Sequence, residues 1–179
     1  MKRLPKYTPA EVRNDPYGFT YKEMSEVIGE NEAKALYEEL YKQLPRKKNL
    51  SMLVKNICKS SDTEKYVYEL KDNKYIETVF IKRRDGGTVC VSTQVGCPVG
   101  CIFCESGRNG FVRNLTSSEI VQQIILLRRK VNRIVFMGMG EGGADKILDY
   151  ADRPSFCLYS SGLSPPRDIL IRFSRYQTI

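Results

Sequence analysis

The stretch that decides the fold is Val89–Cys104, which reads VCVSTQVGCPVGCIFC. It contains four of the six cysteines of the 179-residue chain. The last three, Cys97, Cys101 and Cys104, are spaced C-x-x-x-C-x-x-C in a loop that also holds glycine and proline. Because such a loop can turn sharply, we expect it to bring three thiolates toward one point.

The composition predicts a basic surface and excludes several kinds of active site. Lysine and arginine number 29 against 21 acidic residues, which gives a net charge of +8, and there is no histidine. Basic runs at 46–48, 82–84 and 128–130 favour a polyanionic partner such as RNA, although short charge runs are also common on solvated faces. The lack of histidine excludes Ser-His and Cys-His nucleophile pairs, histidine-ligated zinc and imidazole catalysis.

Neither a membrane segment nor a secretion signal is expected. No apolar run is long enough to span a bilayer, and the first residues, MKRLPKYTPAEVRNDPYG, lack an apolar core. We therefore expect a cytoplasmic protein without a membrane partner. In that compartment clustered cysteines bind metal or do chemistry more often than they form structural disulfides.

The first sixty residues predict three short helices. Residues 20–29 begin with a capping-box sequence and end at a glycine. Apolar side chains at helical spacing predict a second helix over about 31–44 and a third over about 50–58. In this third helix Cys58 would be a small buried hydrophobe.

Strand-like sequence begins at Lys65. The runs KYVYEL, KYIETVFI and TVCVSTQ, separated by turn residues, predict a β-meander that leads into the cysteine loop. After the loop, Thr116–Glu119 has capping-box spacing and opens an apolar helix that ends in RRK, and the run from Arg133 predicts a buried strand. Strand, helix and strand in this order indicate a βα unit of a parallel sheet. No second clear βα repeat follows residue 145.

Three closely spaced cysteines allow two kinds of metal centre. A structural zinc site needs four ligands, and Cys90, in the preceding strand, is the candidate for the fourth. An iron–sulfur cluster held by three cysteines leaves one iron open for a substrate or cofactor. A third hypothesis, a nucleotide site, rests on the G-x-G-x-x-G spacing of Gly138–Gly143, but no acidic residue at the proper distance supports it.

The sequence around the loop resembles a known family. The cysteine spacing, with Phe103 before the last cysteine, is similar to that of radical S-adenosylmethionine enzymes. The segments IETVFI, CVSTQVGC, GFVRNLTSSEIV and VFMGMGE occur in order and resemble motifs of the RlmN/Cfr family of RNA adenine methyltransferases. The resemblance covers about residues 20–141 and is most specific from Glu77 onward.

The resemblance implies an α/β fold class. It implies an N-terminal helical accessory domain over 1–60, linking β-strands over 61–87, the start of a radical S-adenosylmethionine (β/α) barrel over 88–145, and a divergent tail over 146–179. GMGE is followed by GGADKILDY where the family has a Pro-Leu and Asn pattern. Because a βα unit takes about 30 residues, we also expect the barrel of this chain to be incomplete.

Cofactor ligands can be carried over from the family residue by residue. Cys97, Cys101 and Cys104 match the ligands of a [4Fe-4S] cluster, whose open iron binds S-adenosylmethionine in the family. One electron from the cluster then cleaves the sulfonium to methionine and a 5′-deoxyadenosyl radical. Gly140 and Glu141 match the pair that contacts the cofactor. A glycine there would admit close backbone approach, and the carboxylate would accept a hydrogen bond from the methionine ammonium.

Further residues match catalytic positions of the family. Glu77 matches the proton acceptor, and apolar neighbours on its strand face would raise its pKa toward that of a general base. Cys90 matches the strand cysteine that forms a transient disulfide when methylated RNA is released. The family also needs a methyl-carrying cysteine near the carboxyl end. Cys157 lies in the stretch that departs from the family pattern, so we do not assign it this role.

The function implied is methylation of C2 of an adenine in 23S rRNA, with tRNA as a second substrate, through a cysteine-bound methyl intermediate. An electron donor such as flavodoxin would reduce the cluster. Without the methyl-carrying cysteine, we expect this chain alone to turn over poorly. The alternative is an RNA-binding module without enzymatic activity, stabilised by an all-cysteine zinc site. The sequence leaves open whether C2 or C8 is modified and whether the chain forms oligomers.

Overall fold

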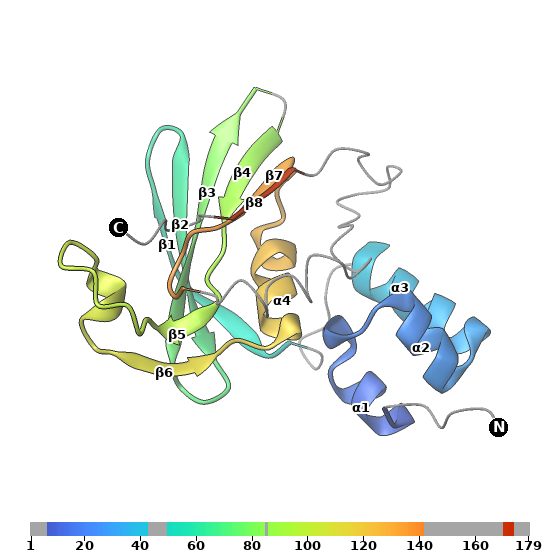
Figure 1. Cartoon of the computed structure of the whole chain (residues 1–179). Helices are drawn as coiled ribbons and strands as arrows, with labels where there is room; N and C mark the ends of the chain where they lie inside the picture. Colours follow the sequence, from blue (N-terminus) through green and yellow to red (C-terminus); the bar gives the residue numbers. More distant parts are fainter. Residues whose placement is uncertain (1–6, 43–49, 85, 142–169, 174–179) are drawn as a thin grey trace.

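The computed structural model describes residues 7–42, 50–84, 86–141 and 170–173. Three helices lie to one side of a mixed sheet, and a fourth helix covers one face of that sheet (Figure 1). In this part of the chain, no helix has the length and apolar character needed to cross a membrane. Cys157 and most of the predicted tail over 146–179 lie outside the described residues.

The N-terminal helices are α1 (Pro9–Asn14), α2 (Tyr21–Ile28) and α3 (Glu30–Lys42), with the short 3-10 helix η1 (Pro16–Gly18) between the first two. The helices expected over 20–29 and 31–44 are therefore confirmed. The capping box of α2 forms as predicted, because the Thr20 hydroxyl accepts from the Glu23 backbone N–H at 3.1 Å. Gly29, with φ of +83°, ends this helix.

The main sheet has six strands in the order β1-β2-β3-β4-β7-β8. Antiparallel pairs join β1 (Met52–Lys59), β2 (Thr63–Leu70), β3 (Tyr75–Arg83) and β4 (Gly86–Cys90). Parallel pairs join β4 to β7 (Arg133–Phe136) and β7 to β8 (Leu170–Phe173). The β-meander is confirmed. So is the βα unit, in which α4 (Ser117–Leu127) connects β4 to β7.

The expected helix over about 50–58 is wrong, because these residues form β1 at the edge of the sheet. A β-bulge between Val54 and Asn56 shifts the register, so that Val54 and Ile57 pair with alternate residues of β2 and share a face. Two apolar residues three positions apart therefore imitate helical spacing. Cys58, expected to be buried, is exposed because it pairs with Lys65 of β2 on the edge of the sheet, and so lies on the sheet face opposite to α4.

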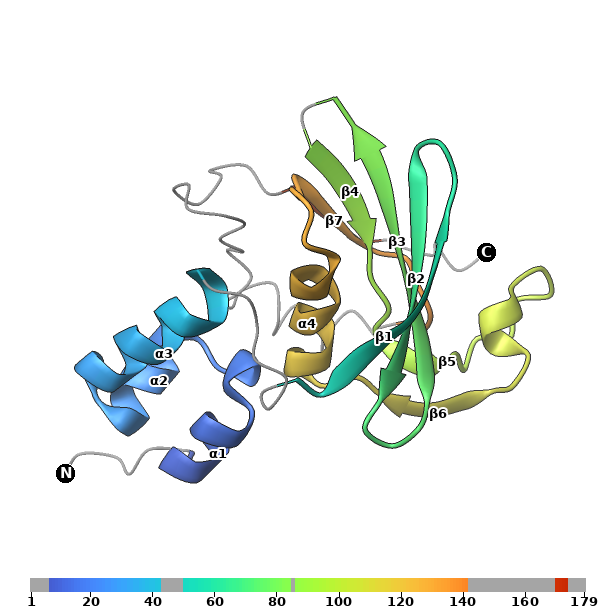
Figure 2. The ribbon, with the colours of Figure 1, turned by 180° about the vertical axis from the view of Figure 1, so that it is seen from behind.

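The two faces of the sheet differ. Buried residues alternate with less buried ones along β2 and β3. The buried side faces α4, as Figure 2 shows from behind. The Tyr68 hydroxyl donates to the Gln123 carbonyl oxygen of α4 at 2.9 Å. The core of this face is apolar, with Tyr66, Tyr68, Leu70, Ile76, Phe80, Val89 and Ile134 from the strands and Ile120, Val121, Ile124 and Leu127 from the helix.

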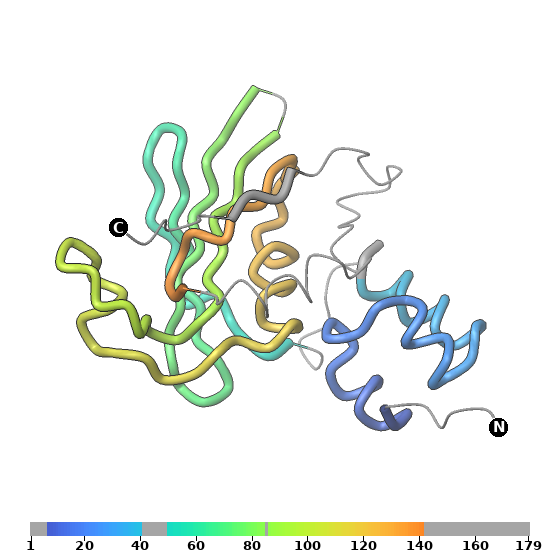
Figure 3. The backbone as a smooth tube through the Cα atoms, viewed as in Figure 1, coloured from blue at the N-terminus to red at the C-terminus, as the bar shows by residue number. Residues whose placement is uncertain are grey.

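A second, two-stranded sheet holds the base of the cysteine loop. It pairs β5 (Gln94–Gly96) with β6 (Phe111–Asn114), and the 3-10 helix η3 (Glu105–Gly107) lies in the loop between them. This hairpin projects from the main sheet at a distance from the β3–β4 hairpin (Figure 3). The α/β class is thus confirmed, with a main sheet that is mostly antiparallel.

Candidate functional site

The candidate site lies where the parallel strands β4 and β7 end. Because the strands are parallel, their carboxyl ends meet at one edge of the sheet. Residues 91–94 follow β4 and residues 137–141 follow β7. The backbone N–H of Thr93 donates to the carbonyl oxygen of Met139 at 2.9 Å. The predicted cofactor loop GMGE therefore packs against the segment that leads into the cysteine loop.

Glycines allow this close packing. A Cβ at Gly138 would lie 2.7 Å from the Val91 carbonyl oxygen, and one at Gly140 would lie 2.6 Å from the Cβ of Gln94. Gly140 also has φ of +103°. The Gln94 Oε1 accepts from the Glu141 backbone N–H at 3.0 Å. The sequence suggested close approach of Gly140 to a cofactor, whereas its close contact in the structure is with Gln94.

A buried glutamine of α4 holds the same segment from the other side. The Gln123 Oε1 accepts from the Ser92 backbone N–H at 2.8 Å, and its Nε2 donates to the Ser92 carbonyl oxygen at 3.0 Å. The Thr78 hydroxyl donates to the same Oε1 at 2.7 Å. The Ser92 hydroxyl donates to the Glu77 carbonyl oxygen at 2.5 Å and accepts from the Met139 N–H at 3.0 Å. This network ties together β3, the end of β4, the GMGE loop and α4.

Sequence reasoning assigned no role to Ser92, Gln94 or Gln123. The hydrogen bonds by which they join α4, β3 and the two loops link residues 15 to 47 positions apart, so local spacing could not reveal them. One signal was present, because Gln122 and Gln123 stand next to each other inside an otherwise apolar helix. A polar side chain on the buried side of a helix needs a hydrogen-bond partner.

The predicted catalytic residues Glu77 and Cys90 lie on the sheet face opposite to α4. Val79 pairs with Cys90 across β3 and β4, and Glu77 stands two residues before Val79, so all three share this face. The apolar environment expected for Glu77 is not found. Its carboxylate lies 2.9 Å from the Lys65 ammonium, and its side chain is 44% exposed. The same hydrogen bond raises the pKa of Lys65.

Cys90 is a half-buried free thiol at the end of β4. Burial raises the pKa of this thiol, and a hydrogen bond from the backbone of Met137 acts in the opposite direction. Because the net shift is upward, Cys90 is protonated at neutral pH. Its contact with Met137 places it beside the start of the GMGE loop.

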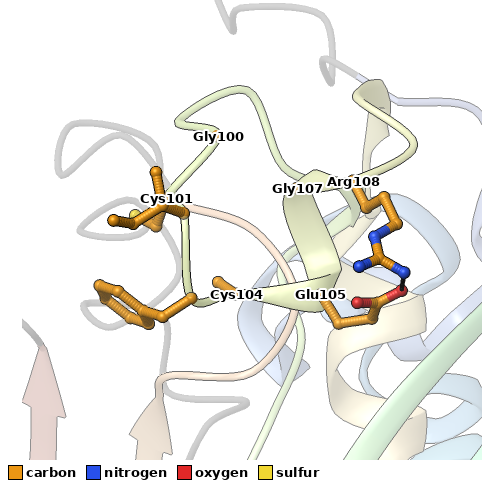
Figure 4. Close-up of a pocket in the computed structure, with 8 residues that line it drawn as sticks. Gly100, Cys101, Cys104, Glu105, Gly107 and Arg108 are labelled. Atoms are coloured by element: carbon orange, nitrogen blue, oxygen red, sulfur yellow. Dashed lines mark ion pairs between the residues drawn. The ribbon is translucent and has the colours of Figure 1, made fainter.

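The cysteine loop surrounds a cavity of about 310 Å³ (Figure 4). Gly100, Cys101, Ile102, Phe103, Cys104, Glu105, Gly107 and Arg108 line it. Glu105 and Arg108 form an exposed ion pair of 3.1 Å. The turn is narrow, because the Cys104 N–H donates to the Cys101 carbonyl oxygen at 3.0 Å. Two of the three predicted ligands thus line one cavity.

The donor chemistry of the loop fits an iron–sulfur cluster, although the thiols are not gathered. Cys97 and Cys101 are partly exposed, and Cys104 is exposed. Across the described ranges, no three Cys, Asp or Glu side chains are grouped so that they could hold a metal ion. Binding a cluster or a zinc ion therefore requires the side chains to turn toward a common point. The assignment of these ligands stays a prediction.

An ion-pair network anchors the base of the loop. Arg113, on β6, donates to the Glu119 carboxylate through two bonds of 2.9 Å and to the Asp72 carboxylate at 2.8 Å. Glu119 is also part of the capping box of α4, because it accepts from the Thr116 N–H at 2.8 Å. One side chain thus fastens the returning strand of the loop to the helix and to the β2–β3 turn.

No protein-family model matches the chain, but individual proteins do. A probable dual-specificity RNA methyltransferase RlmN of Thermotoga sp. (strain RQ2) is 49% identical over 96 residues, which are 51% of this chain and 28% of that protein. One of Thermosipho melanesiensis is 41% identical over 145 residues, which are 77% of this chain and 41% of that protein. This chain therefore spans less than half the length of these relatives.

A solved structure supports the same relationship. The crystal structure of a radical SAM methyltransferase from Sphaerobacter thermophilus matches with a TM-score of 0.68 and 28% identity, over 78% of this chain and 51% of that one. The protein of this structure and the sequence relatives are all named as methyltransferases. The resemblance of this chain to the RlmN/Cfr family of radical S-adenosylmethionine RNA methyltransferases is therefore confirmed, over part of the length of those relatives.

Proposed function

We propose that the chain acts in radical methylation of RNA, at C2 of an adenine in 23S rRNA, with tRNA as a second substrate. The observation that carries this proposal is the junction at the carboxyl ends of β4 and β7. There hydrogen bonds join the GMGE loop to the entrance of the cysteine loop, and Cys90 is hydrogen-bonded to the backbone of Met137, just before GMGE. The reaction class comes from the names of the relatives.

We propose Cys97, Cys101 and Cys104 as the ligands of a [4Fe-4S] cluster, with Gly140 and Glu141 beside S-adenosylmethionine. When bound, these groups would supply the radical and the methyl group. The backbone of Glu141 is held by Gln94, which leaves its carboxylate able to accept from a cationic ligand. A reducing partner such as flavodoxin and a cytoplasmic location are part of the proposal, because the loop thiols must stay reduced.

The sheet face opposite to α4, which we call the open face, would receive the target base. On this face Glu77 is the proposed proton acceptor and Cys90 the proposed thiol of product release. Lys65 pairs with the Glu77 carboxylate at 2.9 Å, so this ion pair must separate for Glu77 to accept a proton from a substrate. An exposed ion pair of this kind separates at little cost.

The larger architecture follows from the same proposal. Helices α1, α2 and α3 would form the accessory domain, and β4, β7 and β8 would be the first strands of a (β/α) barrel. The linking strands begin with β1, since residues 52–59 belong to the sheet.

Cluster assembly can be tested directly. The chain is reconstituted anaerobically with iron and sulfide and reduced, and electron paramagnetic resonance spectra are recorded with and without S-adenosylmethionine. We expect a reduced-cluster signal that changes when the cofactor is added. Cys97→Ala, Cys101→Ala and Cys104→Ala should each abolish it, whereas Cys58→Ala, an exposed cysteine outside the loop, should not.

The zinc alternative gives a different result. A colourless protein that binds one zinc ion, and loses it in the Cys90→Ala variant, would overturn the radical proposal. It would favour an RNA-binding module instead.

A further inference from the structure

The end of the main sheet away from the cysteine loop is strongly basic. Six exposed cations gather there: Arg83, Arg84, Arg128, Arg129, Lys130 and Arg133. We call this group the basic end. It comprises the β3–β4 hairpin, the carboxyl end of α4 and the start of β7, which Figures 1 and 2 both place at the opposite end of the sheet from β5 and β6.

The fold joins two basic runs that are far apart in the sequence. The Asn132 N–H donates to the Gly87 carbonyl oxygen at 2.9 Å, which fastens the segment after α4 to the β3–β4 hairpin. Gly87 pairs with Lys82 across that hairpin. The runs 82–84 and 128–130 are therefore one surface, which their sequence positions did not show.

A single buried carboxylate organises this surface. Glu64, 1% exposed, accepts from Arg129 at 3.0 and 3.1 Å and from the Tyr66 hydroxyl at 2.6 Å, and Lys82 lies 3.6 Å away. The Arg129 hydrogen bonds and the Tyr66 hydroxyl lower the pKa of Glu64 to about 2. The negative charge of Glu64 is thus already paired with Arg129 and Lys82.

Most cations of the basic end make no ion pair with a carboxylate in the described part of the chain. Arg83, Arg84 and Lys130 are among them. Asp62, exposed in the β1–β2 turn, is the other described carboxylate at this end. The surface therefore keeps a large positive excess, carried on long exposed side chains that can follow a flexible polyanion.

We propose that the basic end binds the phosphodiester backbone of the RNA substrate, away from the nucleotide that is modified. The inference rests on the proposed function for the choice of RNA as the polyanion. On β3, Val79 pairs with Cys90 and Glu77 lies two residues further on, so four to six residues separate Arg83 from the candidate site, about 13 to 20 Å at 3.3 Å per residue. An RNA must therefore extend several nucleotides beyond its target nucleotide to reach both. Exposed lysine and arginine without base-reading geometry position an RNA and do not select its sequence.

Binding can be measured on the chain without a cluster, so that this test does not depend on cofactor assembly. Fluorescence anisotropy compares a stem-loop of about 25 base pairs with one of about 5 base pairs at several salt concentrations. We expect the double variant R83E/R84E to bind the long RNA at least 10-fold more weakly. Its slope of log affinity against log salt should fall by about 1 to 2, because each lost phosphate contact removes about 0.7 to 0.9.

The matched control is K22E/K34E, which reverses the same number of charges on exposed positions of α2 and α3. We expect it to bind both RNAs within 2-fold of the original chain, and R83E/R84E to bind the short RNA within 2-fold as well. Circular dichroism melting checks that R83E/R84E folds as the original chain does.

Three outcomes would overturn the proposal. The original chain could fail to bind the long RNA, both double variants could lose affinity equally, or R83E/R84E could retain it. Binding to vesicles with anionic lipid that depends on Arg83 and Arg84, without RNA binding, would also assign the surface to another partner. A chain that binds long RNA through the basic end but forms no cluster would refute the proposed function and leave this inference standing.

Discussion

The two faces of the main sheet use the same strands for different purposes. On the face under α4, Ile76 and Ile134 are fully buried and the polar side chains are hydrogen-bonded. On the other face, the same strands carry the Lys65–Glu77 ion pair and the thiol of Cys90. The covered face holds the backbone in place, and the open face presents groups that can react. The buried packing and the proposed catalytic groups are thus separated by the two-residue period of a strand.

The largest expected effect comes from a cavity on the covered face. Ile76→Ala should lower the free energy of unfolding by about 3 kcal/mol, because it removes a fully buried side chain between β3 and α4. Urea denaturation followed by circular dichroism measures this. Val79→Ala, on the same strand but on the open face, should cost about 1 kcal/mol. Equal losses would show that the two faces do not differ.

Removing the glutamine of α4 should come next. Gln123→Leu leaves the Ser92 peptide and the Thr78 hydroxyl without their buried partners, and we expect a loss of about 2 to 3 kcal/mol. Amide hydrogen exchange should rise in residues 91–94 and 137–141. Thr78→Val removes one bond and should cost about 1 kcal/mol. If exchange in these two segments is unchanged, Gln123 does not position the candidate site.

The buried carboxylate under the basic end predicts a pH dependence. The pKa of Glu64 falls from 4.5 to about 2 on folding, so its stabilisation is complete above pH 4.5 and is lost as the pH falls toward 2. Between pH 6 and pH 3 the original chain should lose about 1 to 2 kcal/mol through this group. Unfolding of Glu64→Gln at both pH values should show a smaller loss, and an equal loss would contradict the assignment.

The smallest effect on stability is expected at the proposed proton acceptor. Glu77→Gln breaks a half-exposed ion pair with Lys65 and should change the free energy of unfolding by less than about 0.5 kcal/mol. If Glu77 accepts a proton in the reaction, the same variant should reduce methyl transfer by a factor of about 100 or more. Lys65→Met is the control, because it breaks the same pair but keeps the carboxylate. A large loss of stability in Glu77→Gln would give the open face a structural role.

Features that depend on neighbours in the sequence could be predicted. The capping boxes at Thr20 and Thr116 form as their spacing indicates, and alternation along 65–81 gives the meander. The prediction of a helix over 50–58 failed because the β-bulge in β1 imitates a helical period. An irregularity of this kind depends on pairing with β2, which the local sequence does not contain.

The candidate site was predictable only in part. The family resemblance pointed to Glu77, Cys90 and the GMGE loop. In the structure Glu77 and Cys90 share one face of the sheet, and the GMGE loop follows β7 at the edge where β4 also ends. The side chains of Ser92, Gln94 and Gln123 join these parts through contacts distant in sequence, so no local pattern reveals them. The ion pair of Glu77 was missed for the same reason, since Lys65 lies on another strand.

The nesting of the GMGE loop against residues 91–94 affects how a deep mutational scan of this region should be interpreted. Gly138 and Gly140 would tolerate no replacement, because any Cβ would collide with Val91 or Gln94. Intolerance at these positions reports packing between two loops and is no proof of ligand contact. Glu141 is held only through its backbone N–H in this contact, so a strict requirement for its carboxylate would report recognition of a ligand.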